Sequence, residues 1–139
     1  MRIYFSGSIA GGRKYVDIYQ KIVAYLKQQG HNVLTEFVAW HNVLEHDKKI
    51  IPEEVFERDM KWLSECDVVI AEVSNPSLGV GYEICQALQL NKAVLCLYHS
   101  DVFVSRIITG NTNQQLTLGE YRDDNEIYKY VDGFLKNIL

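Results

Sequence analysis

Residues 67–88 read DVVIAEVSNPSLGVGYEICQAL, and this stretch predicts the class of the fold. Residues 67–73 form a short apolar run rich in β-branched side chains, which is typical of a buried parallel strand. Asn75-Pro76 ends that strand, because proline has no N–H to donate to a neighbouring strand. Gly79 and Gly81 allow a close approach of the backbone, and the apolar residues after them begin a helical face. A strand, a glycine-bearing turn and a helix make half of a βαβ unit.

Glu83 is the candidate functional residue of this stretch. Ligands of open α/β sheets bind at the carboxyl ends of the strands, and the pattern places Glu83 in the first turn of a helix beside that crevice. A glutamate in a first turn also complements the helix dipole without any further role. Both interpretations stay open on the basis of this stretch alone.

Composition and charge narrow the class of protein. The chain has 139 residues, 47% of them hydrophobic and 23% charged, which is typical of one globular domain spanning residues 1–139. The net charge of −4 argues against a nucleic acid polymer as partner, since phosphate backbones select basic surfaces. No apolar run approaches the ~20 residues of a membrane span, and the chain begins directly with a strand. We therefore expect a cytoplasmic protein with no membrane partner.

The cysteines and histidines indicate no metal site. The three cysteines lack CxxC spacing, and the four histidines show no HExxH pattern. Each cysteine lies in or beside an apolar run and is predicted to be buried. We expect neither a metal ion nor another cofactor.

The rest of the chain alternates strands and helices. Further strands are predicted over residues 2–6, 32–35, 93–98 and 116–118, and helices over residues 13–29, from residue 52, and over residues 120–139. Residues 36–51 show no clean period and are predicted to be an irregular connection of the kind that often forms lids. The alternation predicts a doubly wound, flavodoxin-like or Rossmann-like α/β domain, with a five-stranded, mostly parallel sheet and helices on both faces.

The expected strand order, 2-1-3-4-5, decides where a site would lie. It places the ends of the first and third strands together at the switch point of the sheet. Tyr4, residues 7–13, Ser77, Gly79 and Glu83 would then meet in one crevice, which favours a functional role for Glu83.

The glycine-rich loop at residues 7–13 allows two interpretations. It is neither a P-loop nor a GxGxxG fingerprint. It could present successive N–H groups to an anion, with Arg13 adding positive charge, or it could be a plain turn between a strand and a helix.

Two apolar segments carry further expectations. In the helix from residue 52, the predicted buried stripe consists of Val55, Phe56, Met60 and Leu63. Asp59 lies beside this stripe, where a solvated aspartate is the usual explanation. Residues 102–108 are too apolar for an exposed loop, so we expect them to form a contact surface or to pack under the last helix.

Several of these segments resemble one family of enzymes. They are YFSGSIAGGR (residues 4–13), LTE (34–36), Asp59 with Trp62-Leu63, and AEV through PSLGVGYE (71–83). In order and spacing they resemble the 2′-deoxynucleoside 5′-phosphate N-hydrolases of the nucleoside 2-deoxyribosyltransferase superfamily, over residues 2 to about 110.

The resemblance implies a retaining glycosyl transfer. Glu83 matches the nucleophile of the family, which attacks the anomeric carbon and forms a glycosyl-enzyme that water hydrolyses. Tyr4 matches the tyrosine that orients this nucleophile. Asp59 matches the acid that handles the leaving base, and this match outweighs its interpretation as a solvated side chain.

The resemblance also implies the binding residues. Those expected around the sugar and phosphate are Gly7, Ser8, Ile9, Arg13, Ser77 and Gly79. Ser105, in the segment Ser105-Arg106-Ile107, matches a serine that reaches into the site of a neighbouring subunit, which implies a homodimer with shared sites. Ala10 replaces a substrate-contacting arginine of the family, and Phe37 replaces a histidine that faces the substrate. Phe37 could stack on the base.

Two other functions stay open beside hydrolysis of a deoxynucleoside monophosphate. A nucleoside 2-deoxyribosyltransferase would pass the sugar to a second base, which requires a pocket that excludes water. A non-catalytic nucleotide-binding module is the second alternative. The set of Tyr4, Asp59 and Glu83 argues against such a module, because binding alone requires neither two carboxylates nor a tyrosine.

Overall fold

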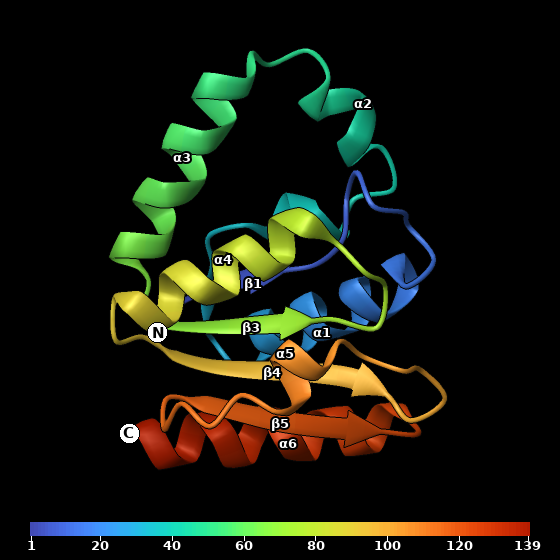
Figure 1. Cartoon of the computed structure of the whole chain (residues 1–139), viewed down its shortest axis with the longest axis vertical. Coiled ribbons are helices and arrows are strands. Elements are labelled where there is room, and N and C mark those ends of the chain that lie inside the picture. The colour runs from blue at the N-terminus through green and yellow to red at the C-terminus, as the bar shows by residue number, and fades with distance from the viewer.

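Five short apolar segments pair into one sheet with the order β2-β1-β3-β4-β5, and every pairing is parallel. The computed structural model describes all residues, 1–139, and Figure 1 shows the sheet with its helices. The strands are β1 (Arg2–Ser6), β2 (Asn32–Val33), β3 (Val68–Glu72), β4 (Ala93–His99) and β5 (Leu116–Tyr121). The predicted α/β class and strand order are confirmed.

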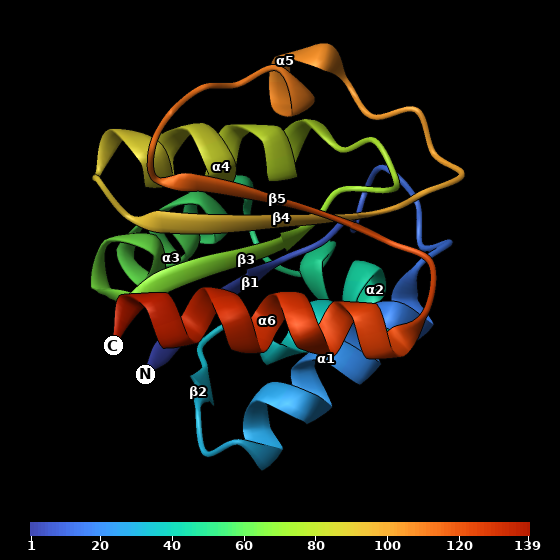
Figure 2. The same cartoon turned by 90° about the horizontal axis from the view of Figure 1, so that it is seen from below.

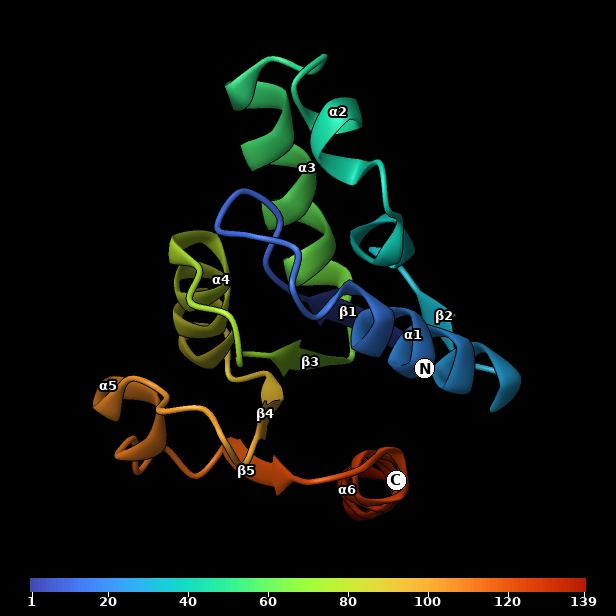
Figure 3. The ribbon, with the colours of Figure 1, turned by 90° about the vertical axis from the view of Figure 1, so that its right-hand side faces the viewer.

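Helices cover both faces of the sheet (Figures 2 and 3). One face carries α1 (Val16–Gln28) and α6 (Asp124–Ile138), and the other carries α3 (Pro52–Glu65), α4 (Leu78–Gln89) and the short α5 (Arg106–Thr109). The chain between β2 and α3 forms the 3₁₀ helix η1 (Glu36–Ala39) and the helix α2 (Val43–Asp47). None of these helices is both long and apolar enough to cross a membrane.

The side chains of the strands alternate between two cores, as a period of two requires. Ile3 and Phe5 of β1 pack in the larger core against α1 and α6. Tyr4 packs in the second core against α4, and Ser6, two residues further along β1, faces the same way. This alternation delivers two hydroxyl groups of β1 to the face that α4 covers.

Several predicted boundaries were wrong by a few residues. Residues 36–51 are not an irregular connection but contain the short helices η1 and α2. β2 ends two residues earlier than predicted, and β5 continues to Tyr121, because it pairs with β4 as far as His99. α6 begins at Asp124 rather than at residue 120, because the side chain of Asp123 accepts a hydrogen bond from the N–H of Glu126 and caps the helix.

Two predictions of burial were also wrong. Phe56 is 54% exposed, and of the predicted stripe in α3 only Leu63 is fully buried. The N-terminal end of α3 rises away from the sheet toward α2 (Figure 1), so it has no core to pack against. Cys85 of α4 is exposed, whereas Cys66 and Cys96 are buried as predicted.

Glu72, the last residue of β3, is fully buried on the α1 and α6 side of the sheet. One carboxylate oxygen accepts a hydrogen bond of 2.7 Å from the N–H of Ser74, whereas the other is buried without a partner. Burial raises the pKa of Glu72 to about 7. The folded protein therefore keeps a proton that the unfolded chain loses near pH 4.5, and ionisation of Glu72 above that pH opposes folding.

We predict that Glu72→Gln makes stability less dependent on pH. In the wild type, Glu72 should lower the free energy of unfolding as the pH rises from 5 to 8, by on the order of 3 kcal/mol. The glutamine variant lacks this ionisation and should lose less stability over the same range. Urea denaturation at both pH values measures the difference, with the exposed Glu57→Gln as control. An equal loss of stability in wild type and Glu72→Gln would contradict the prediction.

Candidate active site

Glu83 lies in the second turn of α4, one turn later than the sequence predicts. Ser77 has an extended backbone, and its hydroxyl accepts a hydrogen bond from the N–H of Val80, so the helix begins at Leu78. Gly79 therefore belongs to the first turn of α4 and not to a turn that precedes it. A Cβ atom on Gly79 would lie 3.8 Å from a carboxylate oxygen of Glu83, so the glycine leaves that side of the carboxylate uncovered.

Two hydroxyl groups from β1 face the carboxylate of Glu83. The hydroxyl of Ser6 donates a hydrogen bond of 3.0 Å to Oε2, and the hydroxyl of Tyr4 lies close enough to lower the pKa of the carboxyl group. Burial acts in the opposite direction and dominates, with a smaller contribution from the charge of Asp59, so the pKa of Glu83 is raised to about 7. Glu83 thus exchanges its proton near neutral pH.

Tyr4 is only 2% exposed and remains a phenol. Burial, and after it the charge of Glu83, raises the pKa of its hydroxyl far above the ordinary value. A tyrosine that keeps its proton can act only as a donor toward the ionised carboxylate, which orients the carboxylate.

Asp59 of α3 faces the same place, so the structure brings the three predicted catalytic residues together. Its negative charge raises the pKa of both Tyr4 and Glu83. The side chain is only 20% exposed, which is not the setting of a solvated aspartate. Burial raises the pKa of Asp59, and a hydrogen bond from Arg58 opposes this effect.

The loop at residues 7–13 is joined to the turn before α4 by Asn75. The amide nitrogen of Asn75 donates to the hydroxyl of Ser8 at 3.0 Å, and to the carbonyl oxygens of Gly11 and Gly12 at 3.2 and 3.1 Å. Gly12 has a φ of +129°, a conformation that favours glycine. The sequence did not predict this role of Asn75, because an asparagine that precedes a proline indicates only a turn.

Gly11 shows how closely these two segments approach. A Cβ atom at this position would lie 2.6 Å from the carbonyl oxygen of Pro76. The loop after β1 and the turn after β3 therefore form one continuous wall beside the first turn of α4, as predicted for the switch point (Figures 1 and 3).

The residues predicted to bind the sugar and phosphate have structural contacts of their own. Arg13 donates to the carbonyl oxygens of Ser8, Val38 and Trp40 at 2.6–2.8 Å. Ser8 is fully buried. Ile9 is partly buried against the larger core, and a Cβ atom on Gly7 would lie 2.9 Å from the ring of Tyr19.

Phe37 lies in an aromatic group beside Asp59. Its ring centroid is 5.8 Å from that of Trp62 in α3 and 6.3 Å from that of Trp40. The guanidinium group of Arg58 lies 4.5 Å over the ring of Phe37. Sequence reasoning singled out Phe37 but missed Arg58, because a charged residue on a helix indicates only a solvated face.

Ser105 and Ile107 are not part of this crevice within the chain. Ser105 caps α5, where its hydroxyl accepts a hydrogen bond from the N–H of Ile107. Ile107 is 81% exposed and Phe103 is 75% exposed. Within residues 102–108, Val104 is buried in the core that α4 covers, with Val102 and Ile108 packed against that core, so the segment does not pack under α6 and exposes only Phe103 and Ile107 among its apolar side chains.

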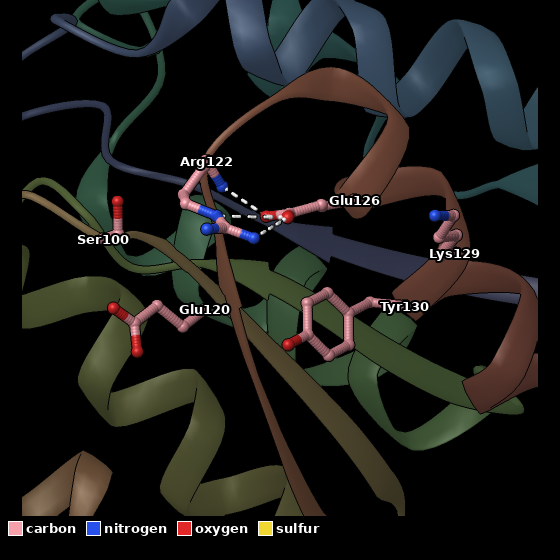
Figure 4. A pocket seen from close by; sticks show the side chains of 6 residues that line it. All are labelled: Ser100, Glu120, Arg122, Glu126, Lys129 and Tyr130. Atoms are coloured by element: carbon pink, nitrogen blue, oxygen red, sulfur yellow. Dashed lines mark hydrogen bonds and ion pairs between the residues drawn. The ribbon is translucent and has the colours of Figure 1, made fainter.

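A separate hollow of the surface lies between the end of β5 and α6 (Figure 4). It has a volume of about 620 Å³ and contains none of the predicted site residues. Its lining residues are Ser100, Glu120, Arg122, Glu126, Lys129 and Tyr130. The guanidinium group of Arg122 is already paired with Glu126 at 2.7 Å. No group of three or more His, Cys, Asp or Glu side chains in the chain could hold a metal ion.

Comparison with known proteins agrees with this geometry. The profile of the nucleoside 2-deoxyribosyltransferase family matches residues 3–118, and the chain belongs to this family. It is 42% identical over 144 residues to the 5-hydroxymethyl-dUMP N-hydrolase of Danio rerio, covering 99% of this chain and 100% of that protein. A protein of Methanococcoides burtonii, provisionally named 2′-deoxynucleoside 5′-phosphate N-hydrolase 1, is 39% identical over 118 residues, covering 85% of this chain and 97% of the relative.

Solved structures share the fold. The CMP N-glycosidase BcmB of Clostridium botulinum aligns with a TM-score of 0.72 and 20% identity, covering 96% of this chain and 99% of that chain. The 2-deoxyribosyltransferase of Bacillus psychrosaccharolyticus aligns with a TM-score of 0.66 and 16% identity, covering 91% of this chain and 90% of that one. The resemblance seen in the sequence is confirmed by the family match.

We predict that Ser6→Ala raises the pKa of Glu83 by about one unit, because a hydrogen bond to the ionised form is lost. A ¹³C NMR titration of labelled glutamate carboxyl groups measures this shift directly. The pKa of Glu72 is also raised to about 7, so its signal is identified by its absence from the spectrum of Glu72→Gln. Ser64→Ala, which removes a hydroxyl on the exposed side of α3, should leave the titration unchanged. A Glu83 titration that is the same in Ser6→Ala and wild type would contradict the prediction.

Proposed function

We propose that this protein hydrolyses the N-glycosidic bond of 2′-deoxynucleoside 5′-monophosphates, through a covalent glycosyl-enzyme on Glu83. The products are the free base and deoxyribose 5-phosphate. Membership of the nucleoside 2-deoxyribosyltransferase family supports the class of bond. The relative from Danio rerio, named as an N-hydrolase of 5-hydroxymethyl-dUMP and similar over its whole length, supports hydrolysis and the monophosphate.

The observation that carries this proposal is the carboxylate of Glu83 facing the hydroxyls of Ser6 and Tyr4, with Asp59 beside it. A nucleophile must be ionised and aimed, and the two hydroxyl groups stabilise and orient the anion. A second carboxyl group with a raised pKa can hold the proton that the leaving base requires.

The reaction proceeds in two displacements. Ionised Glu83 attacks the anomeric carbon, and the base leaves with the electron pair of the glycosidic bond and receives a proton from Asp59. Water then attacks the same carbon and gives a proton to the Asp59 carboxylate, and the ester bond to Glu83 breaks. The cationic character of the sugar in both transition states is stabilised by the adjacent carboxylate.

The 5′-phosphate is assigned to the first turn of α4. The backbone N–H groups of Leu78 and Gly79 have no hydrogen-bond partner within the chain, because the side chain of Ser77 reaches only the N–H of Val80. A helix N-terminus with free N–H groups favours an anion. The loop of Gly7, Ser8, Ile9 and Arg13 lies beside the sugar and phosphate, with Gly7 and Ser8 buried behind its surface, and Phe37 offers a ring on which the base can stack.

The proposal includes a homodimer with shared sites. Phe103 and Ile107 expose apolar side chains beside Ser105, and Leu78 at the start of α4 is 96% exposed. A two-fold contact through α5 would bury such side chains on both subunits at once. It would also place Ser105 at the phosphate of the partner's substrate.

The central experiment is incubation with single nucleotides. Deoxynucleoside monophosphates, including 5-hydroxymethyl-dUMP, should release free base without added metal, and ribonucleotides should react more slowly. Adding a second free base should give no new nucleotide, whereas transfer to that base would support a deoxyribosyltransferase.

Glu83→Ala should fold normally and lose activity by a factor on the order of 10³ or more. Near-normal turnover by this variant would refute the role of Glu83. Release of no base from any nucleotide by the wild type would refute hydrolysis and favour a binding module.

We further predict that Ser105→Ala weakens binding of a deoxynucleoside monophosphate more than binding of the free deoxynucleoside, because the hydroxyl would donate to the phosphate. Binding is measured by calorimetry, and sedimentation should show a dimer for both proteins. Ser100→Ala, at the hollow beside β5, is the control and should change neither affinity. A fully active monomer would contradict the shared site.

A further inference from the structure

Arg58 of α3 lies between two carboxylates at the edge of the candidate active site. Its Nε donates a hydrogen bond of 2.9 Å to Oδ1 of Asp59. Its Nη2 lies 3.9 Å from Oδ1 of Asp47, at the end of α2, and is buried without a hydrogen-bond partner. The side chain of Arg58 is 23% exposed, so its charge is less screened than that of a surface arginine.

Aromatic rings hold the guanidinium group of Arg58 in place. It lies 4.5 Å from the ring centroid of Phe37 and 5.3 Å from that of Trp62. A planar guanidinium group that stacks on rings is restricted to few orientations, so its hydrogen bond to Asp59 needs little further ordering. A lysine could supply the charge but neither the planar stacking nor the directed Nε–H.

The charge of Arg58 affects the pKa of each of the three proposed catalytic residues. It lowers the pKa of Tyr4, Asp59 and Glu83. The other charged group that acts on Asp59 is Asp47, which is negative and raises its pKa. His46 lies 4.0 Å from Asp47 on the exposed side of α2, and Asp47 lies between it and Arg58 in this chain of charges.

We propose that Arg58 is a positioning residue that fixes the carboxylate of Asp59 through Nε and adds a positive charge that favours the anion of Glu83 beside Asp59. This inference rests on the proposed function of the two carboxylates. Two carboxylates in a buried site repel each other, and burial disfavours the charge of each. Without a cation, the pKa of each carboxyl group would rise further, and less of the nucleophile would be ionised at neutral pH.

This role differs from that of a packing residue. If Arg58 only joined α3 to Phe37, its loss would lower stability and leave the ionisation of the site unchanged. If it positions and charges the site, removal of its charge must move the pH at which activity appears. The pH profile therefore separates the two roles.

The test compares Arg58→Gln and Arg58→Lys with the wild type. In Arg58→Gln the acid limb of kcat/KM should move upward by about one pH unit, because an opposite charge near both carboxyl groups is lost. In Arg58→Lys the acid limb should stay near that of the wild type, because the charge remains, while kcat falls with the loss of the Nε hydrogen bond. Lys61→Gln removes an exposed charge from the same helix and should change neither.

A ¹³C carboxyl titration of Glu83 in the same variants makes the test independent of turnover. The pKa of Glu83 should rise in Arg58→Gln, even if the wild type proves to have another substrate. If Arg58→Gln does not fold, Arg58→Met keeps the apolar stem over the two rings and removes the same charge. An unmoved titration and acid limb in a folded, neutral variant would overturn the proposal, whereas a shifted titration without hydrolysis of any nucleotide would refute only the proposed function.

Discussion

The parallel pairing of β1 with β3 is the constraint on which the rest of the site depends. Tyr4 lies opposite Val69 and Ser6 opposite Ala71 in this register, so both hydroxyl groups point to the face that α4 covers. A slip by one residue would turn them toward α1 and α6, because side chains alternate along a strand. Glu83 would then be buried against apolar groups with no donor. The sheet thus determines where the hydroxyl donors around the carboxylate lie, and the helix supplies the carboxylate itself.

One glutamate is buried on each face of this sheet, and the two differ in the groups that stabilise their anions. Burial raises the pKa of both Glu72 and Glu83 to about 7. Glu83 has the hydroxyl of Ser6, the nearby phenol of Tyr4 and the charge of Arg58, all of which favour its anion. Glu72 has only Ser74 beside it, whose hydroxyl and backbone N–H favour the anion, and one of its oxygens is buried without a hydrogen-bond partner. The same raised pKa therefore marks a poised group on one face and an unfavourable charge on the other.

Sequence reasoning predicted the sheet well, because continuous apolar runs between polar turns have few other solutions in a chain of this length. It placed Glu83 one turn too early, because the glycines suggested a turn while Ser77 caps the helix ahead of them. It also overestimated the burial of Phe56, because periodicity does not tell how far a helix follows the sheet. Arg58 was missed for a different reason: its stacking on Phe37 joins residues from η1 and α3, and no local pattern reports such a contact.

Asn75 joins the two halves of the crevice, since its amide bonds to three groups of the loop after β1. Asparagine side chains in exposed turns are prone to deamidation, because the backbone nitrogen of the next residue can attack the side-chain amide. The cyclic product then hydrolyses to an acid. Here the next residue is Pro76, whose ring nitrogen carries no hydrogen and cannot form that cyclic product. Pro76, which ends β3, thus also protects the amide of Asn75 from deamidation. The hydrogen bonds between the two loops should therefore persist over the lifetime of the protein.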